Sequence, residues 1–217
     1  MTIFVLVHGA WHGSWAWDRV VPLLPRAVAP DLTFDRDVGL RDHVAEVVAV
    51  VDELDDPDLV LVGHSSAGLA VRQAADLRPD RVAHVVLVDG WAGPDGASMA
   101  SLAPFMGAVL AAVEDGWRIP APGPAAFGIT DPDDARWLGE RLRGHPLRTF
   151  TEATTLTGAV DRIPGTGVVC QPESLPFAHL AKEIGYRTVA LDGPHDVMLT
   201  DPHGVAEVLL SLRNEKC

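Results

Sequence analysis

The sequence predicts an α/β fold with a mostly parallel sheet flanked by helices. Short runs that are apolar at every position recur along the chain, a pattern typical of strands covered on both faces. Helical segments separate these runs, and strands that alternate with helices form βαβ units. The expected strands cover residues 3–7, 27–29, 60–62, 85–88, 168–170 and 188–191.

Three helices are expected to complete these units. Apolar residues spaced three or four apart give residues 44–54 one apolar stripe, and the Ala- and Leu-rich segment 68–78 ends before Pro79. The last helix begins after Asp201, a candidate N-cap, with Pro202 at its first position.

Residues 90–166 break the alternation. This stretch is rich in Gly, Pro and Ala and contains only short helical pieces, around 98–115 and 133–143. We therefore predict a core built from residues 1–89 and 167–217, with residues 90–166 inserted as a short helical cap over one end of the sheet.

Composition excludes several classes of protein. The 217 residues are 47% hydrophobic and 22% charged, which is ordinary for a globular chain. The net charge of −13 argues against nucleic acid or an anionic membrane as the partner. The sequence shows no signal peptide, and it has no apolar run of about 18 residues, the length that crosses a bilayer. We therefore expect a cytoplasmic protein. Two cysteines do not make a disulfide scaffold. The oligomeric state stays open, with a homodimer as one alternative.

The segment Gly-His-Ser-Ser-Ala-Gly at residues 63–68 follows a strand and opens a helix, which is the context of a nucleophile elbow. Its sharp turn requires small residues two positions before and two positions after the nucleophile. Gly63 and Ala67 satisfy this requirement around Ser65. If Ser66 were the nucleophile, His64 would stand two positions before it, where a small residue is required. Ser65 is therefore the expected nucleophile, and a plain Gly-rich turn is the structural alternative.

A serine nucleophile needs a base, which in this architecture is a histidine late in the chain. His195 stands in a Gly-Pro turn between the last strand and the last helix. His179 and His203 lie in expected helices and are more typical of surface residues. We expect His195 to be the base.

Two carboxylates compete for the third position. Glu173 comes three residues after Cys170, and Asp89 directly follows the strand 85–88. Either side chain is able to accept the imidazole N–H and stabilise the imidazolium. Glu173 is the favoured acid and Asp89 the alternative. In a purely structural role, Glu173 would be a charge at the N-terminal end of a helix and Asp89 would be a turn-forming aspartate.

An oxyanion hole needs two backbone donors. We expect them to be the N–H of Ser66, which follows the nucleophile, and the N–H of Ala10, in the loop after the first strand. His8 and His12 share that loop without a visible third ligand, so no metal site is expected. The chemistry requires no cofactor.

Four segments resemble the α/β-hydrolases related to plant methylesterases and hydroxynitrile lyases, and their bacterial esterase relatives. These segments are residues 4–15 (Phe-Val-Leu-Val-His-Gly-Ala-Trp-His-Gly-Ser-Trp), the elbow, the segment around Glu173 and residues 192–202. The resemblance implies an α/β-hydrolase fold, with Glu173 where the family usually has Asp. The segment from Glu173 to His195 is shorter than in the plant relatives. The lyases add a threonine and a lysine, at positions where this chain has Gly9 and Asp196.

The leading functional hypothesis is a serine hydrolase that cleaves a small, mainly apolar carboxylic ester or thioester through an acyl-enzyme on Ser65. One alternative is a cofactor-free lyase, isomerase or cyclase that uses the same residues as acid and base. Another is a non-enzymatic module that only binds a ligand. The residues expected to line the substrate pocket are apolar residues of the insertion: Trp91, Phe105, Met106 and Trp117, with Phe127 and Trp137 as further candidates.

Overall fold

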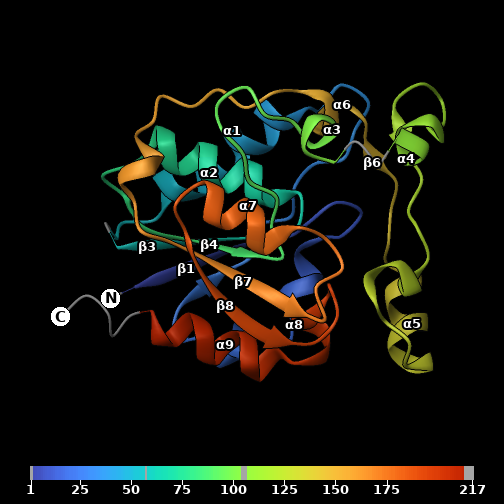
Figure 1. Cartoon of the computed structure of the whole chain (residues 1–217). Helices are drawn as coiled ribbons and strands as arrows, with labels where there is room; N and C mark the ends of the chain where they lie inside the picture. Colours follow the sequence, from blue (N-terminus) through green and yellow to red (C-terminus); the bar gives the residue numbers. More distant parts are fainter. Residues whose placement is uncertain (1, 57, 104–106, 213–217) are drawn as a thin grey trace.

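The computed structural model describes residues 2–56, 58–103 and 107–212 (Figure 1). Its main sheet has the strand order β2-β1-β3-β4-β7-β8, and each neighbouring pair is parallel. The α/β class predicted from the sequence is confirmed. The strands are β1 (Ile3–Val7), β2 (Ala27–Val28), β3 (Leu59–His64), β4 (Val82–Val88), β7 (Gly165–Gln171) and β8 (Arg187–Asp192).

Helices cover both faces of this sheet (Figure 1). One face packs against α1 (Leu40–Glu53), α2 (Ala67–Leu77) and α7 (Phe177–Glu183), and the other against α8 (Val197–Thr200) and α9 (Pro202–Ser211). Successive strand residues pack on opposite faces of the sheet. Leu61 belongs to the core on the face with α1, α2 and α7, and Val62 to the core on the face with α8 and α9. This two-sided burial explains why the strands are apolar at every position.

Helix α9 begins where the sequence predicts, after Asp201. The side chain of Asp201 accepts a hydrogen bond from the Gly204 N–H at 2.9 Å, and Pro202 occupies the first position of α9. Proline is favoured there because its missing N–H has no partner within the helix.

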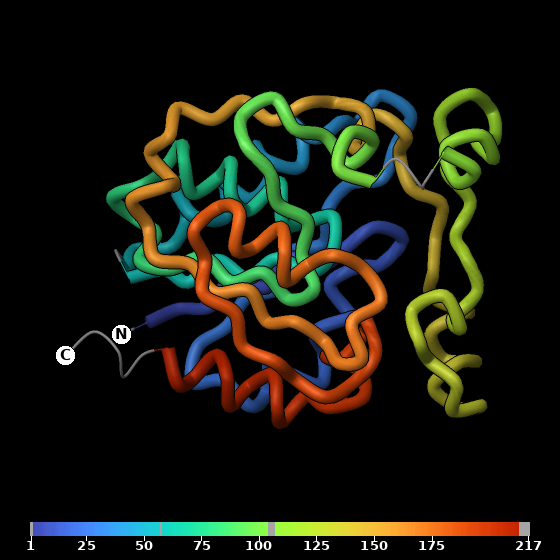
Figure 2. Tube along the Cα trace, in the orientation of Figure 1, coloured from blue at the N-terminus to red at the C-terminus, as the bar shows by residue number. Residues whose placement is uncertain are grey.

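Between β4 and β7 the chain leaves the main sheet. Figure 2 shows that α4 and α5 lie beside the end of the sheet at which the parallel strands have their C-terminal ends. A second, two-stranded antiparallel sheet joins β5 to β6 in this stretch. The expected piece 98–115 is split into α3 and α4, with residues 104–106 outside the described residues. The elements are α3 (Met99–Leu102), α4 (Gly107–Ala111), β5 (Arg118–Ile119), η4 (Pro124–Phe127), α5 (Pro132–Gly139), β6 (His145–Pro146), α6 (Arg148–Thr151) and η5 (Val160–Arg162); two further 3₁₀ helices, η1 (Ser14–Trp17) and η2 (Val21–Leu23), follow β1.

Within the described ranges, none of the helices combines the length and the apolar character that a bilayer crossing requires.

Candidate active site

Ser65 stands at the turn between β3 and α2. Its φ of +51° lies in the left-handed region, which residues other than glycine rarely adopt. A Cβ at position 63 would approach the Val71 side chain to 2.7 Å and the Ala67 carbonyl oxygen to 2.9 Å, so the turn needs glycine there. Ser66, with φ of −58°, already has helical geometry. The strained position is therefore Ser65, as expected of an elbow nucleophile.

A cavity of about 300 Å³ opens at this elbow, and most of its lining is apolar. Trp91 is among the lining residues, whereas Trp117 and Trp137 are not. Phe105 and Met106 lie outside the described residues. The cavity is lined by Ala10, Trp11, Ser65, Ser66, Trp91, Met99, Val109, Pro122, Ala126, Phe127, Phe150, Leu175 and His195.

Ala10 and Ser66, whose N–H groups are the expected oxyanion donors, both line this cavity. Within the part of the chain that the structure describes, neither backbone N–H has a hydrogen-bond acceptor. Gly9 brings the first loop directly against the elbow, because a Cβ at that position would lie 2.9 Å from the Ser65 Cβ. Two unused donors thus stand near the Ser65 side chain, the arrangement that an oxyanion requires.

His195 also lines the cavity, and its Nδ1 donates to Asp89 Oδ2 at 3.1 Å. Asp89 is buried, and its second oxygen accepts a hydrogen bond from the Cys170 N–H at 2.8 Å. The rings of Phe177 and Phe127 stack nearly parallel to the imidazole, at 5.5 and 6.5 Å between centroids. Because Asp89 occupies Nδ1, the nitrogen left for proton transfer with Ser65 is Nε2.

The expected contact between Glu173 and His195 is wrong. Glu173 is exposed, and its Oε1 accepts a hydrogen bond from the Ala178 N–H at 2.9 Å. This bond satisfies an N–H in the first turn of α7, so Glu173 has the structural role of a helix-end charge. Asp89, the alternative, lies at the end of β4, between β3 and β7 in the sheet, and makes the contact.

A group of buried polar side chains that was not predicted from the sequence lies beside His195. Asp196 is fully buried, and its Oδ2 lies 2.9 Å from His12 Nε2. His12 Nδ1 lies 2.8 Å from the Ala10 carbonyl oxygen, and His64 Nε2 donates to the His195 carbonyl oxygen at 3.1 Å. The pairing of His12 with Asp196 joins residues 184 positions apart, which no local pattern signals. A hint was the placement of an aspartate directly before the apolar run 197–199.

The charges of this group follow from burial and from neighbouring groups. Burial opposes charge on both His12 and Asp196, yet their mutual attraction outweighs it: the pKa of His12 is raised and the pKa of Asp196 is lowered. Burial, reinforced by the neighbouring His195, holds the pKa of His64 well below its usual range. Asp196 therefore does not confront the cavity as an unpaired anion.

One group of possible metal ligands occurs among the described residues. His64, His195 and Asp196 offer ligand atoms that lie within 4.8 Å of one another. However, Asp89 binds His195, His12 binds Asp196, and the His64 Nε2–H donates to a carbonyl oxygen. Hydrogen bonds within the protein account for the closeness of the three side chains.

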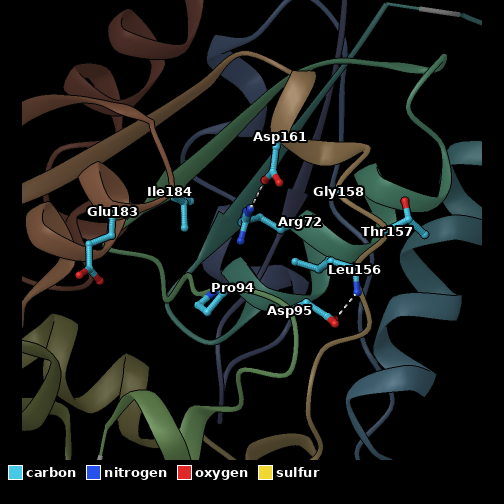
Figure 3. Close-up of a pocket in the computed structure, with 9 residues that line it drawn as sticks. All are labelled: Arg72, Pro94, Asp95, Leu156, Thr157, Gly158, Asp161, Glu183 and Ile184. Atoms are coloured by element: carbon cyan, nitrogen blue, oxygen red, sulfur yellow. Dashed lines mark hydrogen bonds and ion pairs between the residues drawn. The ribbon is translucent and has the colours of Figure 1, made fainter.

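A separate cavity of about 460 Å³ lies beside α2, η5 and α7 (Figure 3). The guanidinium of Arg72 at this cavity donates to the Gly93 carbonyl oxygen at 2.6 Å and to Asp161 at 3.2 Å. The residues around it include neither a serine nor a histidine. The constellation suited to nucleophilic catalysis is the one at the elbow.

In sequence and in fold, this chain is similar to known esterases and α/β-hydrolases. A carbendazim-hydrolysing esterase from Nocardioides sp. is 27% identical over 98% of this chain and 100% of its own length. Methylesterase 7 of Arabidopsis thaliana is 35% identical, over 39% of this chain and 38% of its own length. An extracellular α/β-hydrolase from a Paenibacillus species superposes with a TM-score of 0.84 at 20% identity, over 97% of this chain and 98% of its own.

The model of the α/β-hydrolase family matches residues 4–208. The match covers nearly the whole chain and confirms the predicted enzyme class, a hydrolase of this fold. The resemblance read from the elbow and the first loop is likewise confirmed. This chain belongs to the α/β-hydrolase family.

Proposed function

We propose that this protein is a serine hydrolase that cleaves small, mainly apolar carboxylic esters or thioesters through an acyl-enzyme. One observation carries the proposal. The strained Ser65 and His195 line the same apolar cavity, and His195 is oriented by a buried carboxylate, that of Asp89.

In the proposed reaction, Ser65 Oγ attacks the carbonyl carbon while His195 Nε2 takes its proton. Asp89 keeps the proton of Nδ1 on the far side of the ring and stabilises the imidazolium. The N–H groups of Ala10 and Ser66 bind the oxyanion. His195 then protonates the departing alkoxide or thiolate, and afterwards activates the water that releases the acid.

The cavity favours an apolar substrate. Its volume of about 300 Å³ is at the small end of typical ligand sites, and few polar groups are present to replace the hydration of a charged acyl group. Seven of the lining residues belong to the segment 90–166, among them Met99, Val109 and Phe150, and this supports the proposal that the segment is a cap. The esterase names of the two relatives above support ester hydrolysis.

The test is a panel of p-nitrophenyl esters of graded acyl length, with a matched thioester series. We expect Ser65→Ala to abolish hydrolysis. Ser66→Ala keeps its backbone N–H and is the matched control, so it should retain most of the activity. Equal loss in the two variants would contradict the assignment of Ser65.

Two further outcomes separate the alternatives, and a third tests whether the reaction depends on a metal. Turnover that depends on His195 but survives Ser65→Ala would indicate acid–base chemistry without an acyl-enzyme. A fluorophosphonate probe that fails to label Ser65, with all esters inert, would indicate a binding module. Activity lost in a chelator and restored by zinc would overturn the metal-free mechanism.

A further inference from the structure

The protonation of His12 follows from its two hydrogen-bond partners. The Ala10 carbonyl oxygen only accepts, so His12 Nδ1 must carry a proton to bond it at 2.8 Å. An ionised Asp196 also only accepts, so Nε2 must carry a second proton to bond it at 2.9 Å. A ring with both protons is an imidazolium. Both side chains are fully buried, and a pair with no net charge is the form in which such burial is tolerated.

This pair connects the two loops that carry the catalytic groups. His12 holds the carbonyl oxygen of the peptide between Ala10 and Trp11, and the N–H of that same peptide donates to His145 Nδ1 at 3.4 Å. The peptide is thus held at both ends, which fixes the orientation of Ala10. Asp196 directly follows His195, whose carbonyl oxygen is held by His64 from the elbow.

We propose that His12 and Asp196 form a buried ion pair that sets the position of the Ala10 loop relative to His195, and that both are positioning residues for the proposed hydrolysis. The inference rests on the proposed function, because it assigns the Ala10 N–H to the oxyanion. Neither side chain lines the cavity. Their loss should therefore weaken transition-state stabilisation more than substrate binding.

The first experiment compares Asp196→Asn with Asp192→Asn. Asparagine keeps the shape of the side chain and still accepts from His12, but it removes the charge. Asp192 is exposed at the end of β8 and provides the matched control. We expect Asp196→Asn to lower kcat by about 10- to 100-fold, the size of effect that a misplacement of about 1 Å produces. KM should change by less than about threefold, and the control should match the wild type.

A double-mutant cycle then tests whether the two residues act as a pair. His12→Gln removes the positive charge, and His12→Gln with Asp196→Asn removes both charges. If the pair is the functional unit, the double variant should lose little more activity than the worse single variant. Losses that multiply would mean that the two residues act independently and would overturn the proposal.

The second experiment needs no activity. Long-range ¹H–¹⁵N NMR of the wild-type protein at pH 8 should show both His12 ring nitrogens in the imidazolium state, although an unperturbed histidine is neutral at that pH. The neighbouring His8, His64 and His145 have pKa values lowered by burial, so they contribute neutral rings. His195, the residue adjacent to Asp196, is assigned separately with a His195→Ala sample.

The two measurements separate the possible failures. A neutral His12 ring at pH 8 would overturn the ion pair, whatever the catalytic result. A charged ring together with a fully active Asp196→Asn variant would overturn the positioning role. A charged ring in a protein inert toward all esters would leave the ion pair supported and refute the proposed hydrolysis, and with it the positioning role.

Discussion

The ends of β4 and β7 lie side by side in the sheet, and a carboxylate follows each of them. Asp89 comes immediately after β4, is buried, and uses both oxygens, one toward Cys170 N–H and one toward His195. Glu173 follows β7 by two residues, is exposed, and bonds an N–H of α7. Only the first is in a position to stabilise charge on the histidine.

The difference shows what positions the carboxylate that bonds His195 in this structure. The backbone of a residue directly after a strand is still held by the sheet. Here the Asp89 N–H donates to the Val168 carbonyl oxygen at 2.8 Å. Two residues further on, the chain has already turned toward the next helix. The orientation of a carboxylate is thus set by how tightly its backbone remains tied to the sheet.

The largest effect expected from this comparison is that of Asp89→Asn. An amide in place of the carboxylate does not stabilise the imidazolium, so turnover should fall by up to about 10⁴-fold. Glu173→Gln is the matched substitution on the neighbouring strand and should leave kcat and KM within about twofold. A dead Glu173→Gln variant beside an active Asp89→Asn variant would reverse the comparison.

A smaller effect is expected from Asp89→Glu, which keeps the charge and lengthens the side chain by one methylene. One carboxylate oxygen of Asp89 is already fixed by Cys170 N–H, so the longer side chain misplaces the other relative to the imidazole. Steady-state kinetics should show a loss of about 10- to 100-fold. Full activity would mean that charge alone, without position, suffices.

The smallest effect is expected from Glu173→Ala, and on stability alone. Losing the hydrogen bond to Ala178 N–H removes a helix-end interaction worth about 0.5–1 kcal/mol, so the midpoint of thermal unfolding should fall by about 1–4 °C. The neighbouring exposed Ser174→Ala is the control and should not shift it. An unchanged Tm with reduced turnover would indicate that Glu173 acts in catalysis after all.

The strands, their order of appearance and the elbow were predictable because local patterns determine them. A run such as residues 3–7 must be buried on both faces, and Gly63 with Ala67 permits only one nucleophile. The competition between Asp89 and Glu173 was not resolvable in this way, since both occupy the same kind of local sequence. Their difference arises from the hydrogen bonds that each loop makes in the folded chain.

The pairing of His12 with Asp196 was hidden for a related reason. In the sequence, Asp196 was recognisable only as the residue after His195, at the position where the related lyases have a lysine. In the structure, the carboxylate is turned to a loop near the opposite end of the chain. Contacts between distant loops depend on the completed fold, so buried polar pairs of this kind are the features least accessible to motif analysis.

The tight packing of Gly9 limits how this enzyme is able to diverge. The resemblance described above implies a threonine at this position in the related lyases, but a Cβ here would lie 2.9 Å from both the Ser65 Cβ and the His64 Nδ1. Either the first loop or the elbow must shift before a hydroxyl group is accommodated. Laboratory conversion toward lyase chemistry therefore calls for a shift of the first loop or of the elbow in addition to exchanges at positions 9 and 196.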